Sequence, residues 1–278
     1  MTDTTFHDGS SSGSDGQLAA LFAREPQRTA LTALHAWHAE ISGLPLRISE
    51  PAIGAMRMAW HREAVDDAFA DPPAVRRNPV IEGVAAMRDM PGSPGATALT
   101  GIIDAHDRDF EGRSFSGLDA MAEFAGAGWG KVMSIAAGLL DPEVNEAEPI
   151  AAAGEAWGLT EILRSFPYRA GRGLATIPDD VMAEHGLTLA RIATGREPEL
   201  VRKALQPVIS LARERLEVAR TQVRQLPPVL FPAWAPVALS GAYLNKLERA
   251  DDPYRADLAL SPLTRRLTLM KASLTGRF

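Results

Sequence analysis

Hydrophobic residues recur at intervals of three and four along almost the whole chain from Gln17 onward, and they rarely alternate with polar residues. This spacing places apolar side chains on one face of an α-helix, whereas strict alternation would indicate a β-strand. Proline-containing turns divide the stripes, because a proline lacks the backbone N–H of a helix interior and clashes with the preceding turn. The pattern therefore predicts an all-α protein of about ten helices joined by short connections.

The predicted helices can be placed on the sequence from their stripes and their breakers. The main segments are Gln17–Phe22, Leu31–Trp37, Pro51–Ala70, Ala96–Phe110, Ser116–Leu140, Pro149–Phe166, Pro198–Gln225, Pro228–Arg249 and Pro262–Phe278. Ile53 and Met56 belong to the apolar stripe of their helix. Ser116, with Asp119 three residues later, indicates an N-cap. Pro167 is expected to stop the helix before it.

No linker rich in glycine, serine and proline divides residues 17–278, so these residues are predicted to form one helical domain. Residues 1–16 are mainly Ser, Gly, Thr and Asp, which cannot bury enough apolar surface to offset the cost of ordering. They are predicted to be a disordered tail, and they lack the apolar core of a secretory signal. No run of about 18 apolar residues is present, so no membrane span is expected.

The 278 residues carry a net charge of −6 and contain no cysteine. The acidic balance argues against a nucleic-acid partner, which needs a basic surface. The lack of cysteine excludes disulfides, thiolate chemistry and Cys-ligated zinc. Motifs for phosphate-binding loops, dinucleotide binding, serine hydrolases and zinc proteases are absent. We expect a cytoplasmic protein, or one peripheral to the inner membrane.

An acidic cluster near the end of the helix predicted over 96–110 is the main candidate for a metal site. Asp104 and Asp107 lie three residues apart and share a helical face, and Asp109 follows them. Such carboxylates could hold Mg²⁺ together with a phosphate. The simpler alternative is a solvated helix end whose acids pair with Arg108 and Arg113.

Two histidines, His35 and His38, also share a helical face and could ligate a metal together. No pair of carboxylates accompanies them, so we predict a structural role for both. His61, beside Trp60, is predicted to be structural as well.

One segment carries a family signature. Leu159–Arg164 reads L-T-E-I-L-R and is followed by Gly171, Arg172 and Pro178. This order resembles the squalene and phytoene synthases, in which a helix reading L-T-x-I-L-R-D runs into a Gly-Arg segment and a proline. Ile53–Ala64 resembles another helix of that family, and the resemblance covers about residues 20–250. It implies a single-domain isoprenoid-synthase-type helical bundle around a central cavity.

Members of that family use two D-x-x-x-D motifs, which hold Mg²⁺ ions and through them a prenyl diphosphate. This chain departs from both motifs. The acids of the second motif align with Ser165 and Arg169, and a guanidinium repels Mg²⁺. The first motif falls within 37–46, where Glu40 is the one acid. The resemblance therefore implies that this chain has lost the metal-dependent chemistry of the family and needs no cofactor.

Three further segments resemble a non-catalytic branch of the family, which includes the mitochondrial complex I assembly factor. They are Ile53–Trp60, Leu163–Tyr168 and Phe231–Trp234. The resemblance implies a binding protein that acts in respiratory complex I assembly, with a complex I subunit or assembly intermediate as its partner. One alternative is an active head-to-head prenyltransferase that binds Mg²⁺ through Asp104, Asp107 and Asp109. Another is a non-catalytic carrier of a prenyl or lipid ligand.

The resemblance also nominates residues for ligand binding at one mouth of the bundle. They are Arg57, Trp60, Arg164, Tyr168, Arg169 and Arg172. The four arginines are expected to gather there and bind an anion, because guanidinium groups match phosphate oxygens. Alternatively they pair with Glu40, Asp104 and Asp107. Small residues over 125–136 and 151–158 are expected to line an apolar cavity for a lipid or quinone-like tail.

Overall fold

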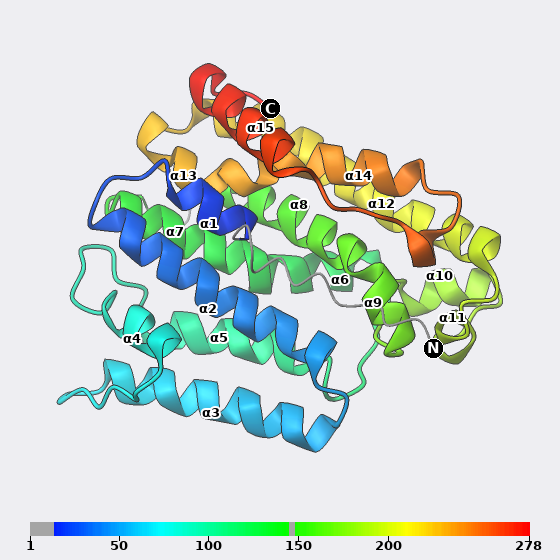
Figure 1. Ribbon diagram of the computed structural model, residues 1–278, viewed down its shortest axis with the longest axis horizontal. Coiled ribbons are helices and arrows are strands. Elements are labelled where there is room, and N and C mark those ends of the chain that lie inside the picture. Colours follow the sequence, from blue (N-terminus) through cyan, green and yellow to red (C-terminus); the bar gives the residue numbers. More distant parts are fainter. Residues whose placement is uncertain (1–13, 145–147) are drawn as a thin grey trace.

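The computed structural model of the protein describes residues 14–144 and 148–278, and every regular element within them is helical (Figure 1). The all-α prediction is thereby confirmed for the part of the chain that the structure describes. None of the helices in these residues is both long and apolar enough to cross a bilayer.

The helices follow one another with short connections. The α-helices are α1 Asp15–Ala20, α2 Gln27–Arg47, α3 Pro51–Phe69, α4 Pro79–Ala85, α5 Gly95–Asp107, α6 Leu118–Ala125, α7 Lys131–Leu140, α8 Glu148–Arg164, α9 Phe166–Gly171, α10 Asp179–Glu184, α11 Leu189–Ala193, α12 Pro198–Gln222, α13 Phe231–Trp234, α14 Ser240–Glu248 and α15 Pro262–Thr275. A π-helix, η2, covers Gly126–Gly130, and 3₁₀ turns cover Val223–Gln225, Pro228–Leu230, Ala235–Leu239 and Pro253–Arg255.

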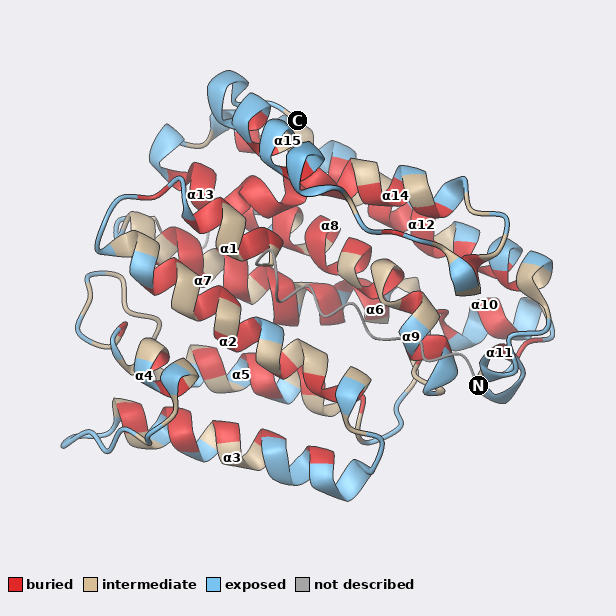
Figure 2. Ribbon diagram, in the orientation of Figure 1, coloured by how far each residue is buried: buried red, intermediate tan, exposed pale blue. Residues whose placement is uncertain are grey.

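Helix α8 runs through the middle of the molecule and packs against α12, α14, α6, η2 and α7 (Figure 1). On one side α12 and α14 pack against it, with α15 at the outer edge, while α2 and α5 lie on the other side with α3 beyond them (Figure 1). Colouring by burial shows α7 and α8 largely buried, and α3 and α15 exposed along their outer faces (Figure 2). Fully buried Trp37, Phe115 and Phe166 are among the largest side chains of the single core.

The N-terminal boundary lies earlier than the sequence predicted. Helix α1 begins at Asp15, and the Ser14 hydroxyl caps it by accepting from the backbone N–H of Gln17. The Gln17 side chain accepts in turn from the backbone N–H of Ser14, which completes a capping box. Asp15 and Gly16 are buried, so assigning residues 1–16 to a disordered tail was wrong at its end. The rest of that segment, residues 1–13, lies outside the described residues.

The helix predicted over Ser116–Leu140 is present, but its details differ. Gly117 is the N-cap and makes no side-chain cap hydrogen bond, so the cap predicted at Ser116 was wrong. The middle turn, η2, has the wider π-helical geometry, which inserts one extra residue into the turn. Helices α6, η2 and α7 follow one another without a break, so the three form one continuous helical segment.

Two other details correct the sequence-based expectations. The helix before Pro167 does end, at Arg164, but a new helix follows at once: Pro167 lies in the first turn of α9, where its missing N–H would have no helical partner. On α3, Ile53 and Met56 are 51% and 72% exposed, so they do not form the buried stripe. Met58 and His61 occupy the buried face instead.

Candidate functional site

Helix α2 carries the segment in which the family's first acidic motif was expected. The buried residues of this helix include two histidines, His35 and His38, which are 2% and 3% exposed. Glu40 lies near the outside, where its Oε1 is 3.3 Å from the Nε2 of His61 on α3. The hydrogen bond from His61 lowers the pKa of Glu40. The first motif position is therefore a single carboxylate held by a histidine.

Aromatic and imidazole rings fill the space beside this segment. The ring cluster consists of His38 of α2, His106 of α5, Phe124 of α6, Trp129 of η2 and Trp157 of α8. The Nε2 atoms of His38 and His106 are 3.3 Å apart. The Trp129 ring centroid lies 5.3 Å from that of His38 and 5.0 Å from that of His106. Edge-to-face packing of this kind gives a tightly filled interior where five elements meet.

The histidines of this region are neutral at physiological pH. Burial lowers the pKa of His35 and of His106 to about 4. Burial, followed by the charge of His106, holds the pKa of His38 well below its ordinary value. The contact between the Nε2 atoms of His38 and His106 needs one donor and one acceptor, which two neutral imidazoles supply. The structural role that the sequence predicted for His35 and His38 agrees with this packing.

The second motif position holds a buried ion pair. Arg169 is 4% exposed and donates to both oxygens of Asp109, at 2.9 and 2.6 Å. Its Nε and Nη2 also donate to the backbone carbonyl of Ala175. Ser165, one turn earlier, donates to the carbonyl of Ile162 at 2.8 Å. At the position that the sequence analysis aligned with the second motif, a guanidinium thus makes a bidentate ion pair with Asp109.

Asp104 and Asp107 both form ion pairs with one arginine side chain, that of Arg62. Nη2 of Arg62, from α3, donates to Asp104 at 2.6 Å and to Asp107 at 2.7 Å. The ion-paired alternative therefore describes these acids, but the predicted partners, Arg108 and Arg113, were wrong. Within 14–144 and 148–278, no group of three or more His, Asp or Glu side chains is arranged to hold a metal. The residues at the two motif positions do not fit a Mg²⁺ site.

The predicted arginine cluster is divided among separate partners. Arg164 binds Asp15 at 3.2 Å and also Glu161, and its guanidinium lies 3.7 Å from the centroid of the Tyr243 ring. Arg169 binds Asp109, as described above. Neither guanidinium pairs with the acids that the alternative prediction named for it.

The other nominated residues lie nearer the surface. Arg57 is exposed, and its charge contributes with that of Arg47 to lowering the pKa of Glu40, after the larger effect of His61. Arg172 is exposed, with Nη2 3.5 Å from the carbonyl of Arg47.

The two nominated aromatic residues are both outside the ring cluster. Trp60 is partly buried beneath Arg76, whose guanidinium lies 5.5 Å from the ring centroid. Tyr168 is 45% exposed.

Asp15 is a central residue that the sequence analysis missed. Its carboxylate accepts from Arg164 of α8, from the hydroxyl of Tyr243 on α14 at 2.8 Å, and from Nε of Arg265 on α15 at 2.6 Å. Burial raises the pKa of Tyr243, so its hydroxyl stays protonated and donates. The capping sequence Ser14-x-x-Gln17 was the signal that Asp15 belongs to a helix.

Two glycines in the predicted cavity walls bring helices into contact. A Cβ at Gly154 of α8 would overlap the backbone of Gly130 in η2. A Cβ at Gly158 would lie 2.9 Å from the Cβ of Ala125. At these positions the absent side chains allow helices to touch, so Gly154 and Gly158 line no cavity. Gly126, Gly130 and Ala151 of the same predicted walls do line a pocket.

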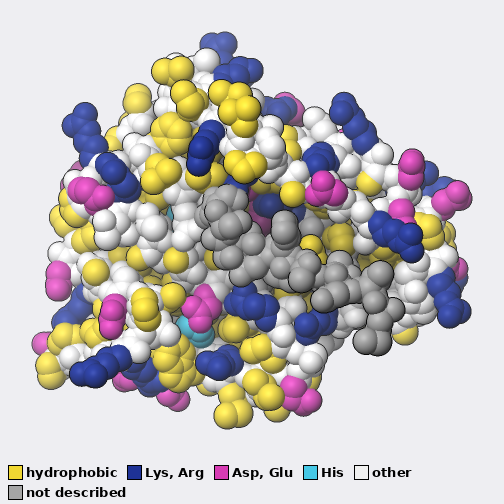
Figure 3. Space-filling model, viewed as in Figure 1, with side chains coloured by type: hydrophobic (Ala, Val, Ile, Leu, Met, Phe, Trp, Pro, Cys, Tyr) yellow, Lys and Arg dark blue, Asp and Glu magenta, His cyan; other side chains and the backbone are white. Residues whose placement is uncertain are grey.

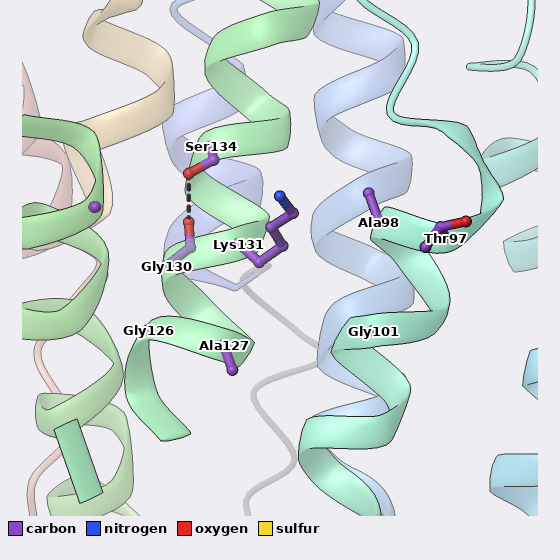
Figure 4. Close-up of a pocket in the computed structure, with 9 residues that line it drawn as sticks. Thr97, Ala98, Gly101, Gly126, Ala127, Gly130, Lys131 and Ser134 are labelled. Atoms are coloured by element: carbon purple, nitrogen blue, oxygen red, sulfur yellow. Dashed lines mark hydrogen bonds between the residues drawn. The ribbon is translucent and has the colours of Figure 1, made fainter. Parts of the chain in front are cut away.

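A groove of about 360 Å³ does lie nearby, between α5 and η2–α7 (Figure 4). It is open to solvent, and Gly101, Ala127 and Gly130 are among its lining residues. Lys131 and Ser134 add two polar groups on the α7 side, and the Ser134 hydroxyl donates to the Gly130 carbonyl at 3.1 Å. This groove is therefore lateral and open to solvent.

The family model for squalene/phytoene synthase matches residues 11–271. The chain belongs to this family. A mouse protein, NADH dehydrogenase (ubiquinone) complex I, assembly factor 6, is 28% identical over 233 residues, which are 83% of this chain and 68% of the relative. A chloroplastic phytoene synthase of Narcissus pseudonarcissus is 33% identical over 119 residues, which are 41% of this chain and 28% of that enzyme.

The fold of the family is confirmed by a solved structure of a dehydrosqualene synthase in complex with a ligand. The two structures match with a TM-score of 0.77 at 14% sequence identity, over 96% of this chain and 93% of the other. At this identity the likeness establishes the isoprenoid-synthase-type helical fold alone.

Proposed function

We propose that this protein acts by binding, as a factor in the assembly of respiratory complex I. The observation that carries the proposal is the match to complex I assembly factor 6 proteins over most of the chain, whereas the phytoene synthase matches over less than half of it. The proposed partner is a complex I subunit or an assembly intermediate. The protein would meet it in the cytoplasm or at the inner membrane surface.

The geometry of the motif positions supports a role without prenyl-transfer chemistry. Mg²⁺-dependent ionisation needs several carboxylates that are free to bind the metal. Here Arg169 places a positive charge at one such position and binds Asp109. Arg62 occupies Asp104 and Asp107. The ring cluster fills space between the helices that would flank a bound prenyl chain.

The first test separates binding from catalysis. We expect the purified protein, given farnesyl or geranylgeranyl diphosphate with Mg²⁺ or Mn²⁺, to release pyrophosphate no faster than buffer. A catalytically active squalene synthase assayed in parallel serves as the positive control. Steady release that Asp104→Ala or Asp107→Ala abolishes would instead establish the prenyltransferase alternative.

The second test addresses complex I. The full chain, tagged and expressed in its native host, should co-purify with complex I subunits. Deletion of its gene in that host should lower the amount of assembled complex I. The untagged gene supplied in trans should restore assembly. Normal complex I levels in the deletion strain would reject the proposal.

A second candidate function, a carrier of a prenyl or lipid ligand, is favoured by the lateral groove. Its volume of about 360 Å³ is within the range of small-molecule pockets. Gly101 offers a probe, because a Cβ there would have no neighbour within 4 Å. We expect Gly101→Leu to fill the groove without disturbing the fold and to remove any lipid that mass spectrometry detects in the native protein. Absence of lipid from both proteins would reject the carrier function.

A further inference from the structure

Helix α15 has one face that is buried and one face that is exposed to solvent. Leu269 and Ala272 are buried against the body of the protein. Leu263, Leu267, Met270 and Leu274 are 66%, 55%, 52% and 84% exposed. These four residues, here called the α15 stripe, are spaced four, three and four apart, so they lie along one side of the helix. The α15 stripe is therefore a continuous apolar surface on the outside of the molecule.

Positive charge accompanies the α15 stripe. Residues 262–278 contain four basic and no acidic residues, although the whole chain has a net charge of −6. Arg265 is buried and binds Asp15, whereas Arg266, Lys271 and Arg277 are exposed. At about 100° per residue, Arg266 and Lys271 fall on opposite sides of the α15 stripe. Hydrophobic side chains gather over α15 with Lys and Arg among them (Figure 3).

A second exposed apolar patch lies at the end of α1. Leu21 and Phe22 follow that helix and are 62% and 37% exposed. The Phe22 ring packs edge-on against Phe231 at 5.1 Å, and the ring contacts continue through Trp234 to Phe278. Phe231 and Trp234 are buried, so this row of rings links the two patches beneath the surface. Helices α1 and α15 are also in direct contact.

We propose that the α15 stripe docks on the surface of a bilayer that contains anionic lipids, with α15 lying in the plane of the interface. Its exposed leucines and methionine would enter the acyl boundary, while Arg266 and Lys271 reach the headgroups on either side. Each basic residue near an anionic surface adds favourable electrostatic energy. The site is independent of the proposed role in complex I assembly.

The charge of the surface favours a lipid occupant over a protein helix. Between 262 and 278 the described surface offers no acidic side chain for a partner's basic residues, and interfaces between proteins are depleted of lysine. The α15 stripe also lies on a single projecting helix, so it suits a planar surface. The helix is already formed: Ser261 caps its start, Gly276 ends it and Arg265 fixes it to Asp15. Little ordering cost is left for binding.

Vesicle flotation with the full chain tests the proposal. We expect binding to vesicles of phosphatidylcholine mixed with phosphatidylglycerol, weak binding to phosphatidylcholine alone, and weaker binding at high salt. The double substitution Leu267→Gln with Met270→Gln keeps charge and helix propensity but removes apolar area. It should weaken binding by at least about tenfold. Arg266→Gln with Lys271→Gln should weaken binding to the anionic vesicles alone.

Met56→Gln is the matched control, because Met56 is an exposed apolar residue of α3, away from α15. This variant should bind as the unaltered protein does. Equal circular dichroism spectra and melting temperatures would show that every variant folds. The proposal is overturned if the unaltered protein does not float with anionic vesicles, or if the α15 variants float as well as Met56→Gln. Loss of a protein contact in the α15 variants without any vesicle binding would assign the surface to a protein partner.

Discussion

At the scale of single residues, the buried Arg169–Asp109 pair is expected to make a large contribution to stability. Both side chains are nearly inaccessible, so removing one leaves the other charged, buried and unpaired. We expect Arg169→Met alone, or Asp109→Leu alone, to lower the free energy of unfolding by about 3–5 kcal/mol. The loss of stability in the double variant should be far smaller than the sum of the two single losses. Urea denaturation of the four proteins measures this cycle, and additive losses would contradict the coupling.

The buried histidines make a second prediction at this scale. An ordinary histidine has a pKa near 6.5, whereas His35 and His106 have values of about 4 in the folded protein. Below pH 6.5 the unfolded chain therefore binds protons that the folded chain does not, so stability falls as the pH falls. The expected slope is about 1.4 kcal/mol per pH unit for each such histidine, down to about pH 4.

Urea unfolding between pH 6.5 and 5 measures this slope above the range in which carboxylates take up most of their protons. His106→Gln should reduce the slope, because it removes one titrating group. Stability that stays constant from pH 7 to pH 5 would show that these histidines are protonated in the folded protein.

Several residue-level features could be predicted from the sequence, but their partners could not. That residues 165 and 169 are Ser and Arg, with no carboxylate between Glu161 and Asp179, is visible in the sequence. That Asp109 would neutralise Arg169 was not visible, because the two residues meet only in the folded bundle. Likewise Arg62, not Arg108, binds Asp104, since α3 and α5 pack side by side. Spacing along a helix identifies which residues share a face, but it does not identify what faces them.

At the scale of elements, the close approach of α8 to η2 explains why α8 carries a glycine at position 154. Gly154→Ala would force α8 away from the backbone of Gly130, because the new methyl group has no space. We expect a loss of about 1–3 kcal/mol, the usual cost of overpacking. Gly101→Ala is the control within helix α5: its methyl group meets nothing within 4 Å, so it should gain up to about 1 kcal/mol. Thermal unfolding compares the two, and equal effects would contradict the packing argument.

The helices themselves followed from hydrophobic periodicity, and most predicted segments coincide with observed ones. Periodicity did not predict η2, because this π-helical turn goes with the close packing of Gly130 against Gly154 of α8, which is a tertiary contact. It also assigned the wrong face to α3. Ile53 and Met56 are apolar but exposed, while Gly54 is buried because the Phe110 ring lies against it. The segment after Pro227, predicted as one helix, is divided into α13, α14 and 3₁₀ turns.

At the scale of the whole molecule, Asp15 ties the two ends of the chain to the central helix. Its carboxylate is the shared acceptor for α8, α14 and α15, so one side chain fixes contacts separated by up to 250 positions in sequence. The position of α15, and with it the direction in which the α15 stripe faces, depends on this acceptor. The prediction of a polar, disordered tail over residues 1–16 gave no indication that Asp15 would be a buried acceptor shared by three helices.

The last prediction therefore concerns Asp15→Asn, which keeps the size of the side chain but removes its charge. Arg164 and Arg265 would lose their shared counter-ion in a buried setting, so the free energy of unfolding should fall by about 3–5 kcal/mol. Asp104→Asn is the matched control: Asp104 pairs with Arg62 but is 61% exposed, and such a pair contributes at most about 1 kcal/mol. Besides urea denaturation, limited proteolysis should cut before α15 sooner in Asp15→Asn than in Asp104→Asn, because the helix loses its attachment. Equal stability and equal cleavage rates in the two variants would mean that packing alone holds α15 in place.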